Sequence, residues 1–305
     1  MTVYRTSASS PDRSVRFSPP SLSVPVQSAD GPLDPAAVLG AVREDIRETL
    51  RMGWVDPALE AAAISPVFFT AAWSAIRPNV GRSFLSLSRG LRTEAVETLR
   101  ARLAVPDLRK DLQARLSEEE FRRAEDCARA AHLVSAKVQI VVHALYRAAR
   151  REPIPGTGRE EPSLRRGVPE WQRWMSFQPA SEPARAALDE AAQMLQTPSP
   201  PTPLRLLARW PAALSAVWAD LGPVMGTDQW KAGLTGLRRV ILRGIRTLPH
   251  PVDLQWAALV ARGFREDERA RLSEILGAHD AAMPMQTLIA AFVWSAFGAP
   301  EIGEG

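Results

Sequence analysis

The chain has 305 residues, of which 46% are hydrophobic and 24% are charged, a composition typical of one large globular domain or two small ones. The single cysteine, Cys127, excludes a framework of internal disulfides, and the lack of a long apolar run or apolar leader predicts a cytoplasmic protein with no membrane span. The net charge of +4 comes from basic residues mixed with Glu and Asp along the predicted helices, which argues against nucleic-acid binding.

The first half of the chain predicts an irregular arm followed by a set of helices. Residues 1–33 are rich in Ser, Pro and Val and have no helical period, so we expect an irregular arm there. Residues 34–150 carry apolar residues at helical spacing, and Gly53 is expected to end the first helix. The predicted helix starts are Asp34-Pro35, Asp56-Pro57, Ser65-Pro66, Ser83 and Ser117, the last forming a capping box with Glu120.

The second half returns to this pattern after a linker. Residues 151–182 hold Pro, Gly and mixed charge, which predicts a linker. A helix from Pro183 to Leu195 follows, and then a break from Thr197 to Pro203 that contains four prolines. Residues 183–305 are therefore expected to form a second set of helices. No segment alternates apolar and polar residues as a strand does, so we expect an all-α fold.

Matching residues recur between the two halves at a nearly constant offset. Two prolines and a tryptophan have counterparts 145 positions later (211 − 66, for example), and a histidine and a glutamine have counterparts 147 positions later (279 − 132). We infer an internal duplication, in which two helical repeats pack as a pseudo-dimer with a ligand pocket at their interface. The matched pairs are Pro66 with Pro211, Trp73 with Trp218, Pro78 with Pro223, His132 with His279, and Gln139 with Gln286.

Several short motifs in both halves resemble one enzyme family. From about residue 40 to the C-terminus, the chain resembles the group I 2-haloacid dehalogenases, also called halocarboxylic acid dehydrogenase-like proteins. The residues that carry the resemblance are Asp45–Arg51 (DIRETLR), Trp54-Val55, Pro66, Ala72-Trp73, Lys137, Ala144-Leu145 and Leu207–Pro211 (LARWP).

The resemblance implies both a fold and a reaction. The family fold is all-α, with two tandem repeats that form a deeply knotted pseudo-dimer, and its members commonly pair again as homodimers. They hydrolyse the carbon–halogen bond of small 2-haloacids without a metal or cofactor. In that reaction an Asp activates a water molecule that attacks C2 directly, an Asn helps to hold the water, and aromatic residues line the pocket.

The family's site residues carry over to this chain only in part. Trp54 falls on a pocket tryptophan, but the pocket Asn falls on Ser135 and its neighbouring Tyr falls on Val138. The catalytic Asp falls on Pro203, and the Ser before it falls on Thr202. Proline cannot act as a base, so three alternatives stay open: the base has moved, the alignment is shifted, or the protein is not a dehalogenase.

Five other polar residues are candidates for the site. Asp56, close to Trp54, could be a displaced base with a raised pKa, or simply a helix N-cap. His132 and His279 could transfer protons, or could be packed core histidines. Gln139 and Gln286 could orient a carboxylate, or could bridge two packed helices. No spacing of Asp, Glu or Cys around the histidines predicts a metal site.

Two functions are therefore compatible with the sequence. The first is a hydrolase of the haloacid dehalogenase type acting on a small carboxylic acid. The second is a non-catalytic helical pseudo-dimer that binds a small carboxylic acid or a protein partner. An enzyme needs Asp56, His132 or His279 within hydrogen-bond reach of a cavity, so the positions of these three side chains distinguish the two functions.

Overall fold

The computed structural model describes residues 34–298 except 104, 163, 165, 178–180 and 198, so the predicted arm (residues 1–33) lies outside the described residues. In this part of the chain no strand is present, only one isolated bridge between Ile154 and Val252, and the predicted all-α fold is confirmed. The α-helices are α1 (Pro35–Leu50), α2 (Pro57–Glu60), α3 (Pro66–Ile76), α4 (Arg82–Arg102), α5 (Arg109–Arg115), α6 (Glu118–Ala149), α7 (Glu182–Leu195), α8 (Thr202–Leu207), α9 (Pro211–Val224), α10 (Asp228–Gly244), α11 (Trp256–Ala261) and α12 (Glu266–Ala296). Short 3-10 turns are η1 (Ala61–Ile64), η2 (Arg77–Asn79), η3 (Glu170–Gln172) and η4 (Ile245–Thr247).

Local hydrogen bonds explain where several helices begin. Asp34 caps α1 by accepting a hydrogen bond from the backbone N–H of Ala36 at 3.0 Å. Ser117 and Glu120 form the predicted capping box at the start of α6. The predicted end of the first helix is wrong: α1 ends at Leu50, because Arg51 adopts the left-handed conformation (φ 58°) that was expected of a glycine.

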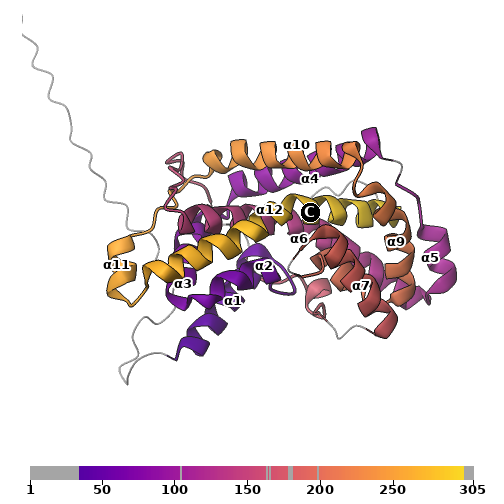
Figure 1. The fold of residues 1–305 in the computed structure, drawn as a ribbon, viewed down its shortest axis with the longest axis horizontal. Helices are drawn as coiled ribbons and strands as arrows, with labels where there is room; N and C mark the ends of the chain where they lie inside the picture. Colours follow the sequence, from indigo (N-terminus) through magenta and orange to yellow (C-terminus); the bar gives the residue numbers. More distant parts are fainter. Residues whose placement is uncertain are drawn as a thin grey trace, which may run out of the picture.

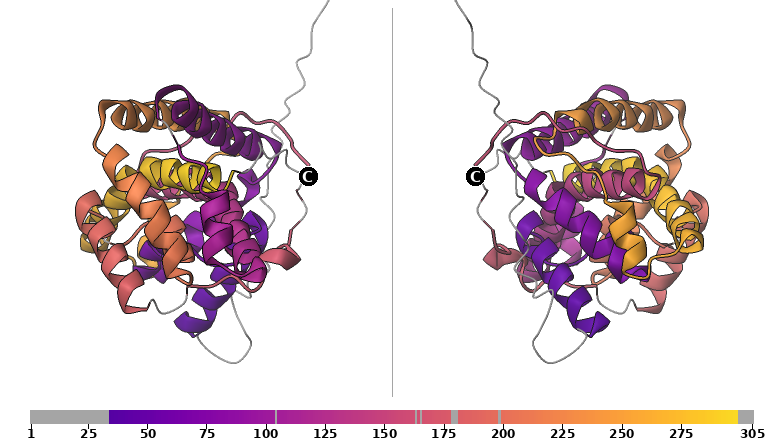
Figure 2. Two further views of the ribbon diagram at one scale, coloured as in Figure 1. Left: turned by 90° about the vertical axis from the view of Figure 1, so that its right-hand side faces the viewer. Right: turned by 90° about the vertical axis from the view of Figure 1, so that its left-hand side faces the viewer.

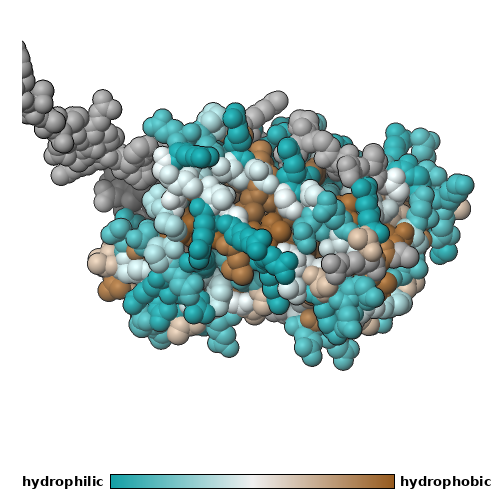
Figure 3. Space-filling view, turned by 90° about the horizontal axis from the view of Figure 1, so that it is seen from above, coloured by the Kyte–Doolittle hydropathy of each residue, from teal (hydrophilic) through white to brown (hydrophobic). Residues whose placement is uncertain are grey.

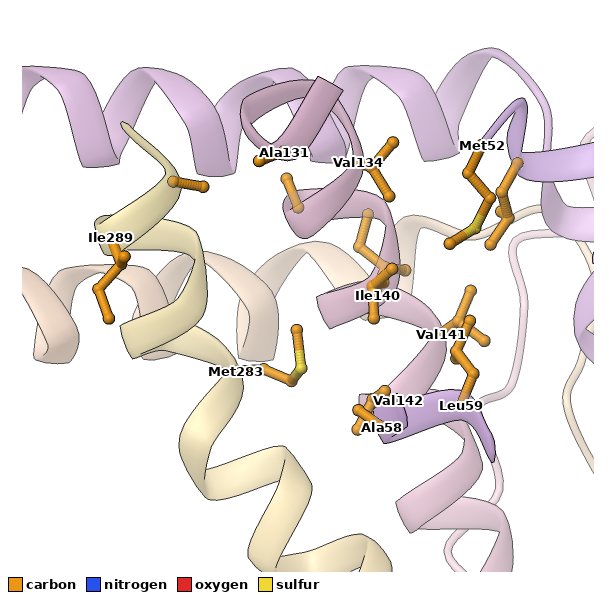
Figure 4. Packing of buried hydrophobic residues seen from close by; sticks show 14 of the residues in the cluster. Met52, Ala58, Leu59, Ala131, Val134, Ile140, Val141, Val142, Met283 and Ile289 are labelled. Carbon is orange, nitrogen blue, oxygen red and sulfur yellow. The ribbon is translucent and has the colours of Figure 1, made fainter. Parts of the chain in front are cut away.

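The two longest helices, α6 and α12, run antiparallel through the centre of the molecule (Figure 1). His132, in the first half of α6, stacks on Trp294 near the end of α12. At the other end of α6, the Ala149 carbonyl accepts a hydrogen bond from Ser273 Oγ at 3.1 Å. Apolar residues of both helices fill the core, together with α2, as Figure 4 shows for Ala58, Leu59, Ile140, Val141, Val142, Met283 and Ile289.

Helices α4 and α10 lie side by side as a layer over this central pair (Figures 1 and 2). Their close approach needs a glycine, since a Cβ atom on Gly233 would lie 2.5 Å from Thr98 Cγ2. Seen from this layer, the surface is mainly hydrophilic with hydrophobic residues between (Figure 3). Leu242 of α10 is an exposed hydrophobic residue. None of the helices in the described residues is both long and apolar enough to cross a membrane.

Helix contacts between the two halves are reciprocal. Helix α11 of the second half packs on α3 of the first, and α5 of the first half packs on α9 of the second. The order of short and long helices from α7 to α12 also follows the order from α1 to α6. The internal duplication stays a prediction, and these reciprocal contacts support it.

Candidate functional site

The carboxylate of Asp56 lies where the first turns of α2 and α8 meet. Asp56 is 2% exposed and caps α2, with Oδ1 accepting a hydrogen bond from the backbone N–H of Ala58 at 2.9 Å. Its Oδ2 accepts a hydrogen bond from Thr202 Oγ1 at 2.7 Å. The predicted N-cap is therefore confirmed. The same side chain also joins the two halves of the chain, because Thr202 opens α8.

Burial, two hydrogen bonds and two neighbouring side chains set the pKa of Asp56. Burial raises the pKa of the Asp56 carboxyl, while the hydrogen bonds and the nearby His279 and Arg205 act in the opposite direction. Burial also lowers the pKa of His279, against the attraction of Asp56. Burial likewise lowers the pKa of Arg205, while the charge of Asp56 acts to raise it. Asp56 makes no ion pair with any described residue, so its charge has no salt-bridge partner in this part of the chain.

Trp54, which stands two residues before Asp56, pairs with a second aromatic residue that contacts Arg205. Trp54 is buried and meets Phe177 edge to face at 6.4 Å between ring centroids. The guanidinium carbon of Arg205 lies 4.0 Å from the centroid of the Phe177 ring, a cation–π contact. The indole N–H of Trp54 is buried without a hydrogen-bond partner in the described chain. An unpartnered buried donor is costly, and an anionic ligand would satisfy it.

The two histidines that the sequence analysis matched, His132 and His279, lie in different environments. His132 is buried, and its ring stacks on Trp294 with 6.4 Å between centroids. Burial, together with the charge of Arg92, lowers the pKa of His132 to about 3. The imidazole is thus neutral at ordinary pH and weakly basic, which favours a packing role. Of the two, only His279 interacts electrostatically with Asp56.

The other predicted residues on α6 and α12 are buried, and one of them bridges the two helices. Ser135 and Val138 are buried on α6. Gln139 Oε1 accepts a hydrogen bond from Thr287 Oγ1 at 2.7 Å, which bridges α6 and α12. Gln139 Nε2 and Gln286 Oε1 are buried without partners among the described residues, so both amides keep unused hydrogen-bonding capacity. The hydrogen bond between Gln139 and Thr287 does not involve Asp56, whose partners are Ala58 and Thr202. Pro203 is buried in the first turn of α8.

Sequence reasoning missed Arg205, Phe177 and the pair formed by His143 and Asp280. Helical spacing could have indicated Arg205, because it follows Thr202 by three positions and so shares a helix face with it. Phe177 lies in the predicted linker, where no period identifies it. His143 Nδ1 on α6 lies 3.0 Å from Asp280 Oδ1 on α12. Asp280 directly follows His279 in the chain.

Among the cavities that the described residues form, two are large enough for a small ligand, and neither is lined by Asp56, His132 or His279. The smaller, of about 550 Å³, lies between the end of α7 and α12. Its lining includes Ala278, which precedes His279, and Thr197, which stands five residues before Thr202. No group of three or more His, Cys, Asp or Glu suited to a metal ion occurs in the described part of the chain.

Comparisons with known proteins relate the chain to one group of enzymes. No family model matches it. A configuration-inverting 2-haloacid dehalogenase of Alcaligenes xylosoxydans xylosoxydans is 24% identical over 258 residues, which cover 80% of this chain and 84% of the relative. A solved D-2-haloacid dehalogenase in complex with L-LA has a TM-score of 0.77 at 18% identity, covering 85% of this chain and 92% of that one. A mutant of D-2-haloacid dehalogenase with D-2-CPA also has a TM-score of 0.77, at 17% identity over 87% and 95% of the two chains. The chain is thus similar in sequence to a configuration-inverting 2-haloacid dehalogenase, and it has the all-α fold of the D-2-haloacid dehalogenases.

Proposed function

We propose that this protein is a hydrolase of carbon–halogen bonds in small 2-haloacids, and that Asp56 is its general base. The observation that carries the proposal is the hydrogen bond from Thr202 Oγ1 to Asp56 Oδ2, 2.7 Å long. By the resemblance, the family's catalytic Asp falls on Pro203, directly after Thr202. Asp56 is hydrogen-bonded to Thr202, the residue before that position. The first half of the chain therefore supplies a carboxylate there, instead of the second half.

The proposed reaction needs no covalent intermediate. Asp56 accepts a proton from a water molecule, and the water oxygen attacks C2 of the haloacid. The electron pair of the carbon–halogen bond leaves with the halide, and the configuration at C2 is inverted. The products are a 2-hydroxyacid, a halide ion and a proton. A buried carboxylate with a raised pKa is a stronger base than an exposed one, and His279 can take the proton onward.

Arg205 and Trp54 are the proposed binding groups for the two negative charges of the reaction. Arg205 contacts the Phe177 ring but makes no ion pair with a described residue, so its guanidinium is available to the substrate carboxylate. The unpartnered indole N–H of Trp54 would then donate a hydrogen bond to the departing halide. The cavity between α7 and α12 is the proposed route by which substrate reaches His279 and Asp56.

The family resemblance also supports further proposals about the whole molecule. We propose that the two halves form a knotted pseudo-dimer, that two chains pair as a homodimer, and that the protein is cytoplasmic. No metal or cofactor enters the proposed reaction.

A non-catalytic role is the second candidate, and two observations favour it. Neither of the two cavities described above is lined by Asp56, His132 or His279. Both oxygens of Asp56 already accept hydrogen bonds, and the side chain is almost fully buried. A carboxylate that only caps α2 and joins it to α8 would look the same. The fold would then hold a small carboxylic acid or a protein partner without chemistry.

Halide release separates the two candidates. The purified full chain would be incubated with the D- and L-forms of 2-chloropropionate and 2-bromopropionate, and released halide and 2-hydroxypropionate would be measured. Halide and hydroxyacid in equal amounts, with inverted configuration, are expected. No halide from a protein that is folded and helical by circular dichroism would leave only the binding role.

Thr202→Val is expected to shift the activity of the enzyme to higher pH. The Thr202 hydroxyl lowers the pKa of Asp56, so its removal raises this pKa further, and the base is then ionised only at higher pH. The acid limb of the kcat/KM profile should move upward in pH. Thr202→Ser, which keeps the hydroxyl, should retain the parent profile. An unchanged acid limb in Thr202→Val would mean that Asp56 does not set it.

Arg205→Gln is expected to raise KM for 2-haloacids about tenfold or more, because a charged hydrogen bond to the substrate carboxylate is lost. The matched control is Arg209→Gln, which removes an exposed arginine that lies over the rings of Trp174 and Trp210. Its kinetic constants should stay near the parent values. Equal effects of the two substitutions would argue against substrate binding by Arg205.

A further inference from the structure

The larger of the two cavities lies apart from Asp56, between α3 and α11. Its volume is about 810 Å³, within the range of pockets that hold small organic ligands. Helix α11 belongs to the second half of the chain and α3 to the first, so both halves form its walls. Figure 1 shows these two helices together at one end of the molecule, away from α7 and α9.

Backbone hydrogen bonds hold one wall of this cavity in place. The linker and the segment before α11 pair through Ile154 and Val252, with N–H···O distances of 3.1 and 2.9 Å. The N–H of Gly158 donates to the Pro249 carbonyl at 2.9 Å, and the N–H of His250 donates to Oδ1 of the buried Asn79 at 2.8 Å. The wall is therefore preformed, which lowers the entropic cost of binding a ligand.

The lining of the cavity combines an apolar floor with two cations. The floor is formed by Ala71, Ala75, Pro78, Pro249, Leu254 and Leu259. Arg159 and Arg262 also line the cavity, and both are exposed. Neither guanidinium makes a hydrogen bond, ion pair or ring contact with any residue that the structure describes. Asp253 lines the cavity as well, so these three groups have a net charge of +1.

We propose that this cavity binds an amphipathic monocarboxylate whose apolar chain or ring is larger than that of a 2-haloacid. The apolar body would lie on the floor, where burial of its surface favours binding. The carboxylate would pair with Arg159 and Arg262, since guanidinium groups form short, charge-assisted hydrogen bonds to carboxylates. A single negative charge matches the net charge of the lining. This site is independent of the proposed hydrolysis, because it shares no residue with the Asp56 site.

The test is binding of 2-naphthoate to the full chain by isothermal titration calorimetry. One saturable site is expected, and the neutral analogue 2-naphthalenemethanol should bind about tenfold more weakly or worse, since it lacks the charge. The double variant Arg159→Gln, Arg262→Gln should lose at least about tenfold in affinity for the same reason. The matched control Arg243→Gln, at an exposed arginine of α10 outside the cavity, should bind as the parent does.

Two further variants locate the probe. Ala75→Trp fills the cavity and is expected to abolish binding, with folding checked by circular dichroism. If Ala75→Trp does not fold, the affinity of the double variant Arg159→Gln, Arg262→Gln for 2-naphthoate still tests the proposal, because both arginines are exposed. Asp56→Asn should bind 2-naphthoate like the parent. The proposal is overturned if binding is absent at millimolar probe, if acid and alcohol bind equally, if the arginine variant is unaffected, or if Asp56→Asn loses the site.

Discussion

Asp56→Asn is expected to reduce halide release by about a hundred- to ten-thousand-fold, the usual contribution of a general base. Asparagine keeps the shape of the side chain, can accept the hydrogen bond from Ala58 N–H and can donate one to Thr202 Oγ1. It is also a good N-cap. The substitution therefore removes the basic oxygen with little change in geometry, and initial rates with 2-chloropropionate report the loss.

The matched control is Asp34→Asn, at the other Asp-Pro helix start. Asp34 also caps a helix, accepting from Ala36 N–H at 3.0 Å, but it is exposed and lies at the beginning of α1. Its variant should release halide at the parent rate. Full activity in Asp56→Asn, or an equal loss in Asp34→Asn, would remove Asp56 from the mechanism.

The stability of Asp56→Asn distinguishes loss of a base from loss of the fold. Because burial raises the pKa of Asp56, its protonated form is favoured in the folded state. The stability that protonated Asp56 contributes is fully present below the pKa that Asp56 has in the unfolded chain. It is lost as pH rises through the higher pKa of the folded protein, so the charged carboxylate destabilises the fold at higher pH. Asp56→Asn should thus unfold at a temperature at least as high as the parent at pH 8, with the difference shrinking toward pH 4. A large loss of stability at pH 8 would mark Asp56 as structural.

Gly53→Ala is expected to lower the free energy of unfolding by about 1–3 kcal/mol, as overpacking does. A Cβ atom at Gly53 would lie 2.2 Å from the backbone carbonyl oxygen of Gln172, and a carbonyl oxygen cannot rotate away as the end of a side chain can. Either the linker or the segment that carries Trp54 and Asp56 must move. Activity should fall along with stability, since near-attack geometry tolerates little displacement.

Urea unfolding and halide release measure the two effects of Gly53→Ala. The control is Gly40→Ala, at an exposed position within α1 where a Cβ atom would meet nothing within 4 Å. Alanine there should stabilise the protein by about 0.5–1 kcal/mol, because glycine loses more conformational freedom in a helix. If Gly53→Ala were as stable and active as the parent, the linker would not hold the site segment in place.

The helices of this protein follow from local sequence signals. The caps at Asp34, Asp56 and Ser117 and the apolar spacing of the helices depend on residues within one turn of each other, so the chain itself determines them. The same locality explains the error at Gly53. A glycine is typical of a helix end, but Arg51 adopts the left-handed conformation, and Gly53 is needed instead for its contact with the linker.

The site depends on contacts that no local pattern contains. The sequence alone identified Asp56 as a candidate base and matched His132 with His279, but it treated the two histidines as equivalent. Packing separates them: His132 is buried against Trp294, whereas His279 faces the charge of Asp56. A pKa depends on burial and on neighbouring charges, and both are set by residues far apart in the chain.

The pairing of Asp56 with Thr202 illustrates the same division between sequence and tertiary structure. Local sequence patterns predicted an all-α chain, several helix starts and the candidate carboxylate. The folded chain brings that carboxylate to Thr202, 146 positions away, and places near it Arg205, which contacts Phe177. Helix caps involve groups a few residues apart, whereas this site is formed when α2 and α8, from opposite halves, pack on the same long helix α6.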